Sequence, residues 1–325
     1  MKELTYDTMV IGGGAAGMSA ALEIAGNGFS VAIVEREAHL GGILLQCIHN
    51  GFGLQLFKKE LTGPEFADEL IQQLRETNVA VYLDTTVAHL SDEEEGRVAY
   101  CYSATYGVSK ITARSVVLAM GCRERNRGGI RTPGTRPAGV FTAGLAQRLV
   151  NVEGYIPGKD VVIVGSGDIG LIMARRMTWV GAKGHAVIEI KPYPSGLTRN
   201  IVQCLNDFDI PLYLSHVVSK IEGKDRVEKV EVTPLREGIP NPDEAFEIAC
   251  DTLLLSVGLV PENELSREAG VTLNPQTNGA AVDSRMMTSV PGVFSCGNVL
   301  HVHDLADYVA EEAQRTGRYV VDYLN

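Results

Sequence analysis

The chain has 325 residues and a net charge of −11, and 45% of it is hydrophobic while 21% is charged. This length allows two domains with separate cores, and the composition is that of an ordinary globular protein with an excess of 35 glycines. The acidic balance argues against nucleic acid or an anionic membrane surface as a partner, and because no apolar stretch approaches about 18 residues we expect no membrane insertion.

The N-terminus and the cysteines indicate the compartment. The first seven residues are acidic and lead directly into an apolar strand, which is not the pattern of a signal peptide. The six cysteines form no CxxC motif and no His/Cys spacing typical of a zinc site. We therefore expect a cytoplasmic protein with reduced thiols.

The first half of the chain opens with a β-α-β pattern. We expect a buried strand over 6–11, a helix of small residues over 15–27 and a second apolar strand over 29–34. The turn before the helix carries a GxGxxG fingerprint, in which Gly12 permits a tight turn, Gly14 lets the backbone approach a pyrophosphate and Gly17 lets helix and strand pack closely.

Two further features support a nucleotide at this turn. The helix that starts with Ala15 and Ala16 would point its positive N-terminus at the phosphates. Glu35 follows the second strand, 18 residues after Gly17, where an acid would accept hydrogen bonds from a ribose.

The rest of the first half is predicted to be a helix over 64–77, a strand over 79–83 and β-structure over 85–118 with a turn at 104–107. The last strand leads into Ala119, Met120 and Gly121. The basic, glycine- and proline-rich stretch 122–139 is interpreted as the first crossing between domains.

The second half repeats this plan. Residues 161–190 again predict β-α-β, and the turn holds a second fingerprint with Gly165, Gly167 and Gly170 around Asp168 and Ile169. A helix over 197–206, short strands over 212–232 and an apolar run over 253–258 that ends in Gly258 follow. Pro261 marks the return crossing, and a helix over 305–324 closes the chain.

Glu189 ends the second strand of this repeat. A carboxylate there would repel a 2′-phosphate and so favours NAD(H) over NADP(H), although Lys191 could instead attract that phosphate.

These patterns predict an α/β protein with two Rossmann-like, three-layer dinucleotide-binding domains, each with a small β-meander. The first domain would be discontinuous, over 1–122 and 262–325, and the second would span 123–261. Two dinucleotide sites in one chain are most simply explained by hydride transfer between them.

The two fingerprints, the run that ends in Gly121 and the Gly297-Asn298 pair resemble, in this order, the pyridine nucleotide–disulfide oxidoreductase fold. The resemblance implies FAD at the first fingerprint and NAD(P)H at the second. Met120 replaces a Thr of that pattern, and Asn298 replaces an Asp that binds the flavin ribityl chain. The resemblance implies FAD contacts from Gly12, Gly14, Ala15, Ala16, Gly17, Glu35, Arg36, Gly41, Gly42, Ile43, Val87, Ala119, Met120, Gly121, Gly297 and Asn298, and NAD contacts from Gly165, Gly167, Asp168, Ile169, Gly170, Glu189 and Gly258.

The redox disulfide of that fold is missing. Where the cysteine pair would follow Gly41-Gly42, the chain has Leu44 and His49, and Cys47 lies in neither position. The second domain has no CxxC, and the chain ends without the interface domain of glutathione-reductase-like enzymes. We expect no dithiol chemistry; a lone Cys47 that acts through a sulfenate, as in peroxidases of this fold, is the alternative to a packing role.

Polar side chains on two segments would lie beside the flavin in this fold. Cys47 and His49 belong to the first, residues 41–53, and His301 and His303 follow Gly297-Asn298. A histidine at the N-terminus of the last helix could stabilise reduced flavin or shuttle a proton. The alternatives are a loop with satisfied side chains and capping or surface histidines.

The strings over 41–53 and 296–304 resemble, more narrowly, small bacterial flavoproteins that accompany anaerobic glycerol-3-phosphate dehydrogenase-like proteins, and α-type subunits of opine oxidase, hydrogen cyanide synthase and sarcosine oxidase. This resemblance implies an FAD-dependent NAD(P)H oxidoreductase that exchanges electrons with a partner flavoprotein or iron–sulfur protein. The alternatives are a stand-alone NADH oxidase or peroxidase that uses Cys47, and a non-catalytic assembly component that contains flavin.

Overall fold

The computed structural model describes residues 1–94 and 96–325 and divides into two compact units. Unit 1 comprises Met1–Arg123 and Val260–Asn325, and unit 2 comprises Glu124–Leu259. The chain passes between the units at β9 (Cys122–Glu124) and β19 (Leu259–Pro261), which pair as a two-stranded sheet. The boundaries lie one and two residues from those expected for the two domains.

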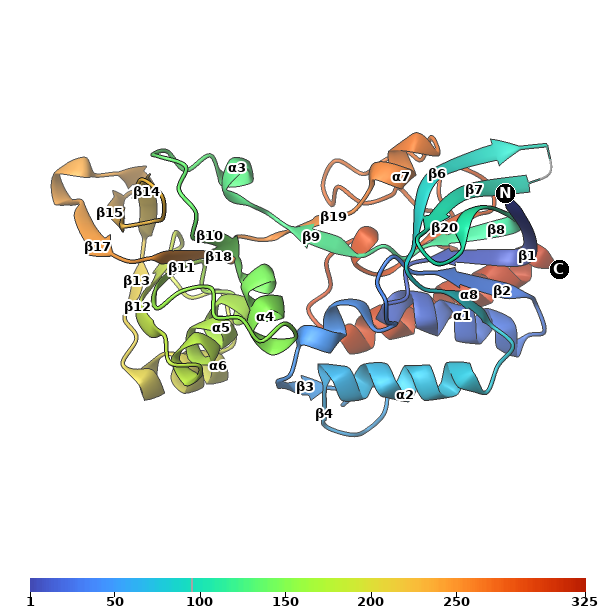
Figure 1. Cartoon of the computed structure of the whole chain (residues 1–325), viewed down its shortest axis with the longest axis horizontal. Helices are drawn as coiled ribbons and strands as arrows, with labels where there is room; N and C mark the ends of the chain where they lie inside the picture. The colour runs from blue at the N-terminus through green and yellow to red at the C-terminus, as the bar shows by residue number, and fades with distance from the viewer. Residues whose placement is uncertain (95) are drawn as a thin grey trace. The chain divides into compact units, whose positions relative to one another are not determined.

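Unit 1 is built on a seven-stranded sheet (Figure 1). Its parallel strands are β5 (Ala80–Tyr82), β2 (Val31–Val34), β1 (Lys2–Ile11), β8 (Gly107–Leu118) and β20 (Val293–Ser295), in this spatial order. The first half of β8 also pairs antiparallel with β7 (Gly96–Ser103), and β7 pairs with β6 (Thr85–Glu93). These last strands are the small meander that the sequence predicts.

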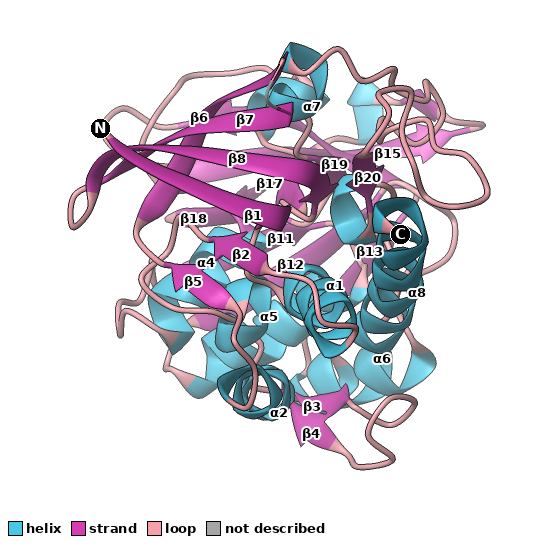
Figure 2. Ribbon diagram, turned by 90° about the vertical axis from the view of Figure 1, so that its right-hand side faces the viewer, coloured by secondary structure: helices cyan, strands magenta, loops and turns pink. Residues whose placement is uncertain are grey.

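Three helices cover one face of this sheet: α1 (Ala15–Gly26), α2 (Gly63–Arg75) and α8 (Ala306–Leu324). Helices α1 and α8 lie side by side (Figure 2). Their close approach requires small residues, because a Cβ on Gly317 would come within 3.0 Å of the backbone oxygen of Ala20. Helix α2 begins with a capping box in which Thr62 and Glu65 satisfy each other's backbone groups.

The opposite face of the parallel strands packs against the meander and α7 (Glu264–Glu268). The other elements of unit 1 are short: η1 (Gly42–Gln46), β3 (Asn50–Phe52), β4 (Leu61–Thr62) and η4 (Gly297–Val299). The 41–53 segment, for which a loop with satisfied side chains is one of the expected alternatives, begins with a turn of 3₁₀-helix.

Unit 2 has a fully parallel five-stranded sheet between two layers. The strand order is β10 (Val140–Thr142), β18 (Thr252–Leu255), β11 (Asp160–Val164), β12 (Lys183–Glu189) and β13 (Leu212–Leu214). Helices α4 (Ala143–Asn151), α5 (Asp168–Trp179) and α6 (Thr198–Cys204) cover one face. Antiparallel strands β14 (His216–Glu222), β15 (Lys229–Arg236) and β17 (Phe246–Ala249) cover the other.

The remaining elements of unit 2 are α3 (Arg127–Ile130), η2 (Asn206–Phe208), β16 (Ile239–Pro240) and η3 (Pro242–Glu244). Both units are therefore three-layer α/β structures, as the two fingerprints predict.

Strand β10 and helix α4 are elements that the sequence analysis does not predict. The cap of α4 is supplied from a distance: the Glu124 carboxylate accepts hydrogen bonds from the backbone N–H groups of Gly144 (2.8 Å) and Leu145 (3.3 Å). The N-cap residue Thr142 makes no side-chain capping bond, and the acceptor comes instead from 20 positions upstream of Gly144.

Candidate functional site

The first fingerprint forms the turn between β1 and α1, and its three glycines have different surroundings. Gly12 has φ +107°, and a Cβ there would lie 2.4 Å from the carbonyl oxygen of Ala119. A Cβ on Gly17 would lie 1.8 Å from the oxygen of Gly12. A Cβ on Gly14 would meet no atom of the described chain within 4 Å. The outer two glycines are thus required by packing, while the middle one faces open space.

The second fingerprint repeats this division between β11 and α5. Gly165 has φ +96°, and a Cβ there would lie 2.0 Å from the oxygen of Ser256, while one on Gly170 would lie 2.3 Å from the oxygen of Gly165. A Cβ on Gly167 again has open space, with nothing from residues 1–94 or 96–325 within 4 Å. The two turns are built alike, although their sequences differ at the second, fourth and fifth of the six positions.

Both helices begin at their open glycine. Gly14 and Gly167 are the N-cap residues of α1 and α5, and no side chain in the described parts of the chain caps either helix. The first backbone N–H groups of each helix are therefore available to an anion, and the helix dipole favours one. A dinucleotide pyrophosphate fits this combination of open space and free donors.

Four segments of unit 1 meet at the first turn. The N–H of Gly41 donates to the oxygen of Gly13 (2.8 Å), and the N–H of Ala119 donates to that of Ile11 (2.9 Å). A Cβ on Gly42 would lie 3.3 Å from the Cα of Gly14. Gly297 is close enough to α1 that a Cβ would lie 2.8 Å from that of Ala16. The structure thus brings together the residues that the sequence assigns to FAD from these segments.

Glu35 also belongs to this group. Its buried carboxylate accepts hydrogen bonds from the N–H groups of Gly13 (2.6 Å) and Glu37 (2.8 Å). Of the other residues assigned to FAD, Val87 is buried in the sheet core, Met120 and Gly121 are half-buried, and Arg36 and Ile43 are exposed.

Asn298 joins the turn after β20 to its surroundings. Its Oδ1 accepts a hydrogen bond from the backbone N–H of His303 (3.0 Å), and its Nδ2 donates to Sγ of Cys122 (3.7 Å). The amide thus uses both of its polar atoms, which a carboxylate at this position could not do, because it has no donor.

Glu189 occupies in unit 2 the place that Glu35 has in unit 1. Its carboxylate is buried and accepts hydrogen bonds from the N–H groups of Ser166 (2.9 Å) and Lys191 (3.0 Å), and from the Ser166 and Ser195 hydroxyls. Burial opposes ionisation, but the hydrogen bonds outweigh it, and the pKa of Glu189 lies below its ordinary value. A negative charge is therefore fixed at the end of β12.

The remaining residues of the second fingerprint have distinct positions. The Asp168 carboxylate is held by the start of α6, where Oδ1 accepts from Leu197 N (2.8 Å) and Asn200 Nδ2 (2.7 Å). Ile169 is half-buried, and Gly258 is exposed with φ +102°.

Cys47 lies at the C-terminal end of η1. It is 6% exposed, and burial raises the pKa of its thiol to about 12. No disulfide joins any of the six cysteines in the described chain. His49 stacks against Phe52, with ring centroids 5.2 Å apart; its Nδ1 contacts the oxygen of Asn50 (3.0 Å), whereas its buried Nε2 has no hydrogen-bond partner among the described atoms.

Two carboxylates of α8 are functional candidates that the sequence analysis misses. Asp307 accepts hydrogen bonds from the N–H groups of Gly53, Gln55 and Leu56. Glu312 accepts one from the N–H of Gly297 (2.7 Å) and contacts both His301 and His303. Both carboxylates are buried. Because Asp and Glu are rarely buried without a partner, acidic residues on the apolar face of the predicted helix could have indicated these two candidates.

No helix within the described residues combines the length and the apolar character needed to cross a membrane.

Sequence and structure comparisons agree on the class of protein. Thioredoxin reductase from Treponema pallidum (strain Nichols) is 26% identical over 306 residues, which cover 91% of this chain and 90% of the relative. The crystal structure of thioredoxin reductase from T. acidophilum matches 98% of both chains with a TM-score of 0.79 at 23% identity, and that likeness concerns the fold.

Components of larger enzymes are similar as well. The HcnB subunit of hydrogen cyanide synthase from Pseudomonas protegens is 25% identical, and an opine oxidase subunit from Agrobacterium tumefaciens (strain Ach5) is 26% identical. The match covers about 90% of this chain but only 66% and 61% of these two relatives.

Residues 6–317 match the family described as pyridine nucleotide-disulphide oxidoreductase. The chain is therefore an FAD-dependent NAD(P)H oxidoreductase that belongs to the pyridine nucleotide-disulphide oxidoreductase family.

Proposed function

We propose that this protein passes electrons between NAD(H) and a partner redox protein through FAD, without a redox disulfide. In this proposal unit 1 binds FAD and unit 2 binds NAD(H). The observation that carries it is the pair of matching turns, each with an open middle glycine and an uncapped helix N-terminus. When bound, FAD supplies the carrier that can exchange a hydride with nicotinamide.

The residues of unit 1 support a defined set of roles. The first N–H groups of α1 would bind the pyrophosphate above Gly14, and Glu35 would accept a hydrogen bond from the adenosine ribose. Asn298 would face the ribityl chain.

In unit 2 the first N–H groups of α5 would bind the nicotinamide dinucleotide above Gly167, and the charge on Glu189 would disfavour a 2′-phosphate.

The state of Cys47 supports a route that does not use a thiol. A thiol whose pKa is raised to about 12 is neutral at physiological pH, whereas nucleophilic cysteines carry a lowered pKa. The described chain also holds no disulfide. Electrons would then leave the flavin directly, which requires an acceptor that can approach unit 1.

Exposed apolar side chains on two joined segments support a docking surface for that acceptor. Leu54 and Tyr308 are 50% and 48% exposed. They lie on the segments that the Asp307 carboxylate ties together, because Asp307 bonds to the backbone on both sides of Leu54. Two similar proteins, HcnB and the opine oxidase relative, are named as subunits, which fits a protein that works with a partner.

Anaerobic reduction of the reconstituted protein tests the cofactor roles. NADH should bleach one FAD per chain, and an artificial dye should then reoxidise it. If NADH does not bleach the flavin while a chemical reductant does, the proposed electron entry is wrong and the non-catalytic alternative is favoured. Rapid, sustained peroxide reduction by the purified chain would favour the peroxidase alternative.

Affinity purification from the native cells tests the partner. A protein that travels with the chain supports the proposal only if its own redox group is reduced when NADH is added to the reconstituted pair. Leu54→Lys and Tyr308→Lys should slow that reduction but leave NADH-to-dye transfer unchanged. Ile239→Lys, at a side chain of unit 2 that is 70% exposed, is the control and should have no effect on either rate.

A further inference from the structure

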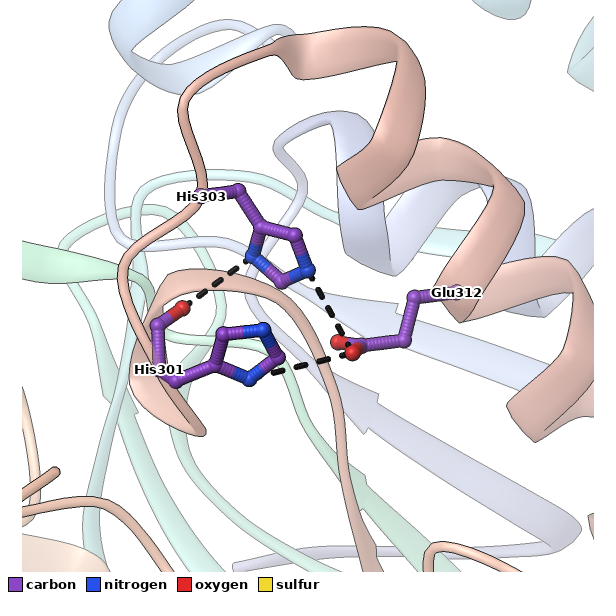
Figure 3. Close-up of side chains that lie close together, drawn as sticks. All are labelled: His301, His303 and Glu312. Carbon is purple, nitrogen blue, oxygen red and sulfur yellow. Dashed lines mark hydrogen bonds and ion pairs between the residues drawn. The ribbon is translucent and has the colours of Figure 1, made fainter.

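Two histidines and a buried glutamate converge in unit 1 at one point (Figure 3). His301 and His303 come from the segment between η4 and α8, and Glu312 comes from α8. Oε2 of Glu312 lies 3.3 Å from Nε2 of His303 and 3.8 Å from Nδ1 of His301. All three side chains offer ligand atoms within 4.8 Å of one another, and in the described chain this is the one group of three or more such side chains with this spacing.

The two distances from Glu312 are close to the edge length of a metal coordination shell. Zinc bonds to imidazole nitrogen and carboxylate oxygen are about 2.0–2.1 Å long, which places neighbouring ligand atoms of a tetrahedron about 3.4 Å apart. The Glu312–His303 distance of 3.3 Å already fits, and the Glu312–His301 distance of 3.8 Å needs only a small ring movement.

Hydrogen bonds hold His303 and Glu312 in place through the atoms that face away from the cluster. Nδ1 of His303 lies 3.1 Å from the carbonyl oxygen of His301, and since a carbonyl only accepts, this nitrogen carries the proton. Glu312 uses its other oxygen, Oε1, to accept from the N–H of Gly297. Such outer partners orient the side chains of protein metal sites.

The tautomer of His303 creates a requirement for positive charge. With the proton on Nδ1, the lone pair of Nε2 points at the carboxylate of Glu312, only 3.3 Å away. Two lone pairs at this distance repel each other unless a second proton or a cation lies between them. Both groups are nearly buried, with exposed side-chain fractions of 9% and 6%, so water cannot relieve the repulsion efficiently.

The cluster also has an open side. His301 is 43% exposed, and all three side chains line a pocket of about 760 Å³ together with Met286 and Tyr308. A cation held by the three protein atoms would therefore have room for a water molecule or another small ligand in a fourth position, as in open zinc sites.

We propose that His301, His303 and Glu312 form a binding site for one divalent first-row transition metal ion, of which Zn²⁺ is the representative. Two neutral imidazoles and one carboxylate suit such an ion, whereas Ca²⁺ and Mg²⁺ require more oxygen ligands. The ion would join the turn after β20 to α8, because Glu312 also bonds to Gly297.

Titration of the full-length, metal-stripped protein with Zn²⁺ tests this site. Calorimetry should show one Zn²⁺ bound per chain, and Co²⁺ should give the visible absorption bands of a four-coordinate site. His303→Ala and Glu312→Gln should each weaken Zn²⁺ binding at least about 100-fold, beyond the loss typical of outer partners. Zn²⁺ should raise the melting temperature of the starting protein and not that of either variant.

Two controls keep the result decisive. His89 and Glu268 also pair in unit 1 on exposed segments, so His89→Ala should leave the affinity unchanged. His301→Ala, at the most exposed of the three ligands, tests the site in a variant whose core is intact. No saturable binding would overturn the proposal and leave a protonated His303–Glu312 pair. If His89→Ala loses as much Zn²⁺ affinity as the three ligand variants do, Zn²⁺ binds adventitiously elsewhere. The same conclusion holds if none of the three ligand variants loses affinity.

Discussion

At the scale of single residues, the fingerprint glycines fall into two groups, one required by packing and one proposed to lie beside a bound dinucleotide. The outer glycines of each turn leave no space for a Cβ, whereas Gly14 and Gly167 have extended backbone and open space beside them. Substitutions at these neighbouring positions can therefore distinguish the proposed binding role from the packing role.

We predict that Gly14→Val yields a folded protein that no longer binds FAD, because the side chain fills the space proposed for the pyrophosphate. Gly167→Val should keep FAD and lose NADH affinity. Gly17→Val is the contrasting control: it should impair folding, because its Cβ would overlap the oxygen of Gly12. Circular dichroism, flavin content and NADH titration measure these effects. FAD retained in Gly14→Val at normal affinity would contradict the assigned site.

We predict that NADH reduces the protein faster than NADPH and that Glu189→Gln narrows the difference. The hydrogen bonds to Glu189 hold the pKa of its carboxyl low, so the charge persists on mild acidification and the preference should persist with it. Stopped-flow bleaching with each nucleotide measures the ratio. Lys191→Ala is the companion variant. If Lys191→Ala alters the ratio of the NADH and NADPH rates and Glu189→Gln does not, Lys191 sets the preference between the two nucleotides.

We predict that Cys47→Ser keeps NADH-to-dye electron transfer within a few-fold of the starting value, because loss of an essential nucleophile costs orders of magnitude more. With its pKa raised to about 12, the thiol is uncharged below that pH, so two-electron reduction should produce no thiolate-to-flavin charge-transfer band at neutral pH. A thousand-fold loss, or such a band that disappears in the variant, would restore the peroxidase alternative.

At the scale of elements, α8 organises the segments around it through two buried carboxylates. Glu312 holds the turn after β20, and Asp307 holds the backbone of residues 53–56 with three hydrogen bonds of 2.9–3.0 Å. The apolar face of the helix places it against α1, while these side chains fix the neighbouring loops.

We predict that Asp307→Ala lowers the free energy of unfolding by about 3 kcal/mol, because backbone donors at a buried site lose their acceptor. Asp307→Asn keeps one acceptor oxygen and should cost about 1 kcal/mol. Urea unfolding of the two variants measures the difference. Asp322→Ala, on the last turn of the same helix, is an exposed control that should change little.

At the scale of the whole molecule, unit 2 is continuous in sequence and has its own sheet with a core on each face. We predict that residues 124–259 fold alone, unfold cooperatively in urea and bind NADH without FAD, because no strand of the five-stranded sheet comes from outside this range. Unit 1 needs both of its segments, since β20 and α8 complete its sheet and its helix layer. A molten or insoluble 124–259 fragment would contradict this independence.

The features that repeat locally can be predicted from the order of the residues alone. The period of apolar residues and the glycine spacing predict both β-α-β units, the meander and the last helix, because strands, turns and amphipathic helices are specified by neighbouring residues. Element ends differ by one to three residues at most of these positions, as helix 64–77 shows by beginning at Gly63 and ending at Arg75.

Features made by residues far apart in the chain depend instead on the tertiary structure. The cap of α4 comes from Glu124, the anchor of residues 53–56 from Asp307, and the third member of the histidine cluster from Glu312. None of these partners leaves a local pattern, because burial and hydrogen bonding at each position depend on which segments the sheet brings together. The same holds for Cys47, whose chemistry follows from its burial and not from its neighbours in sequence.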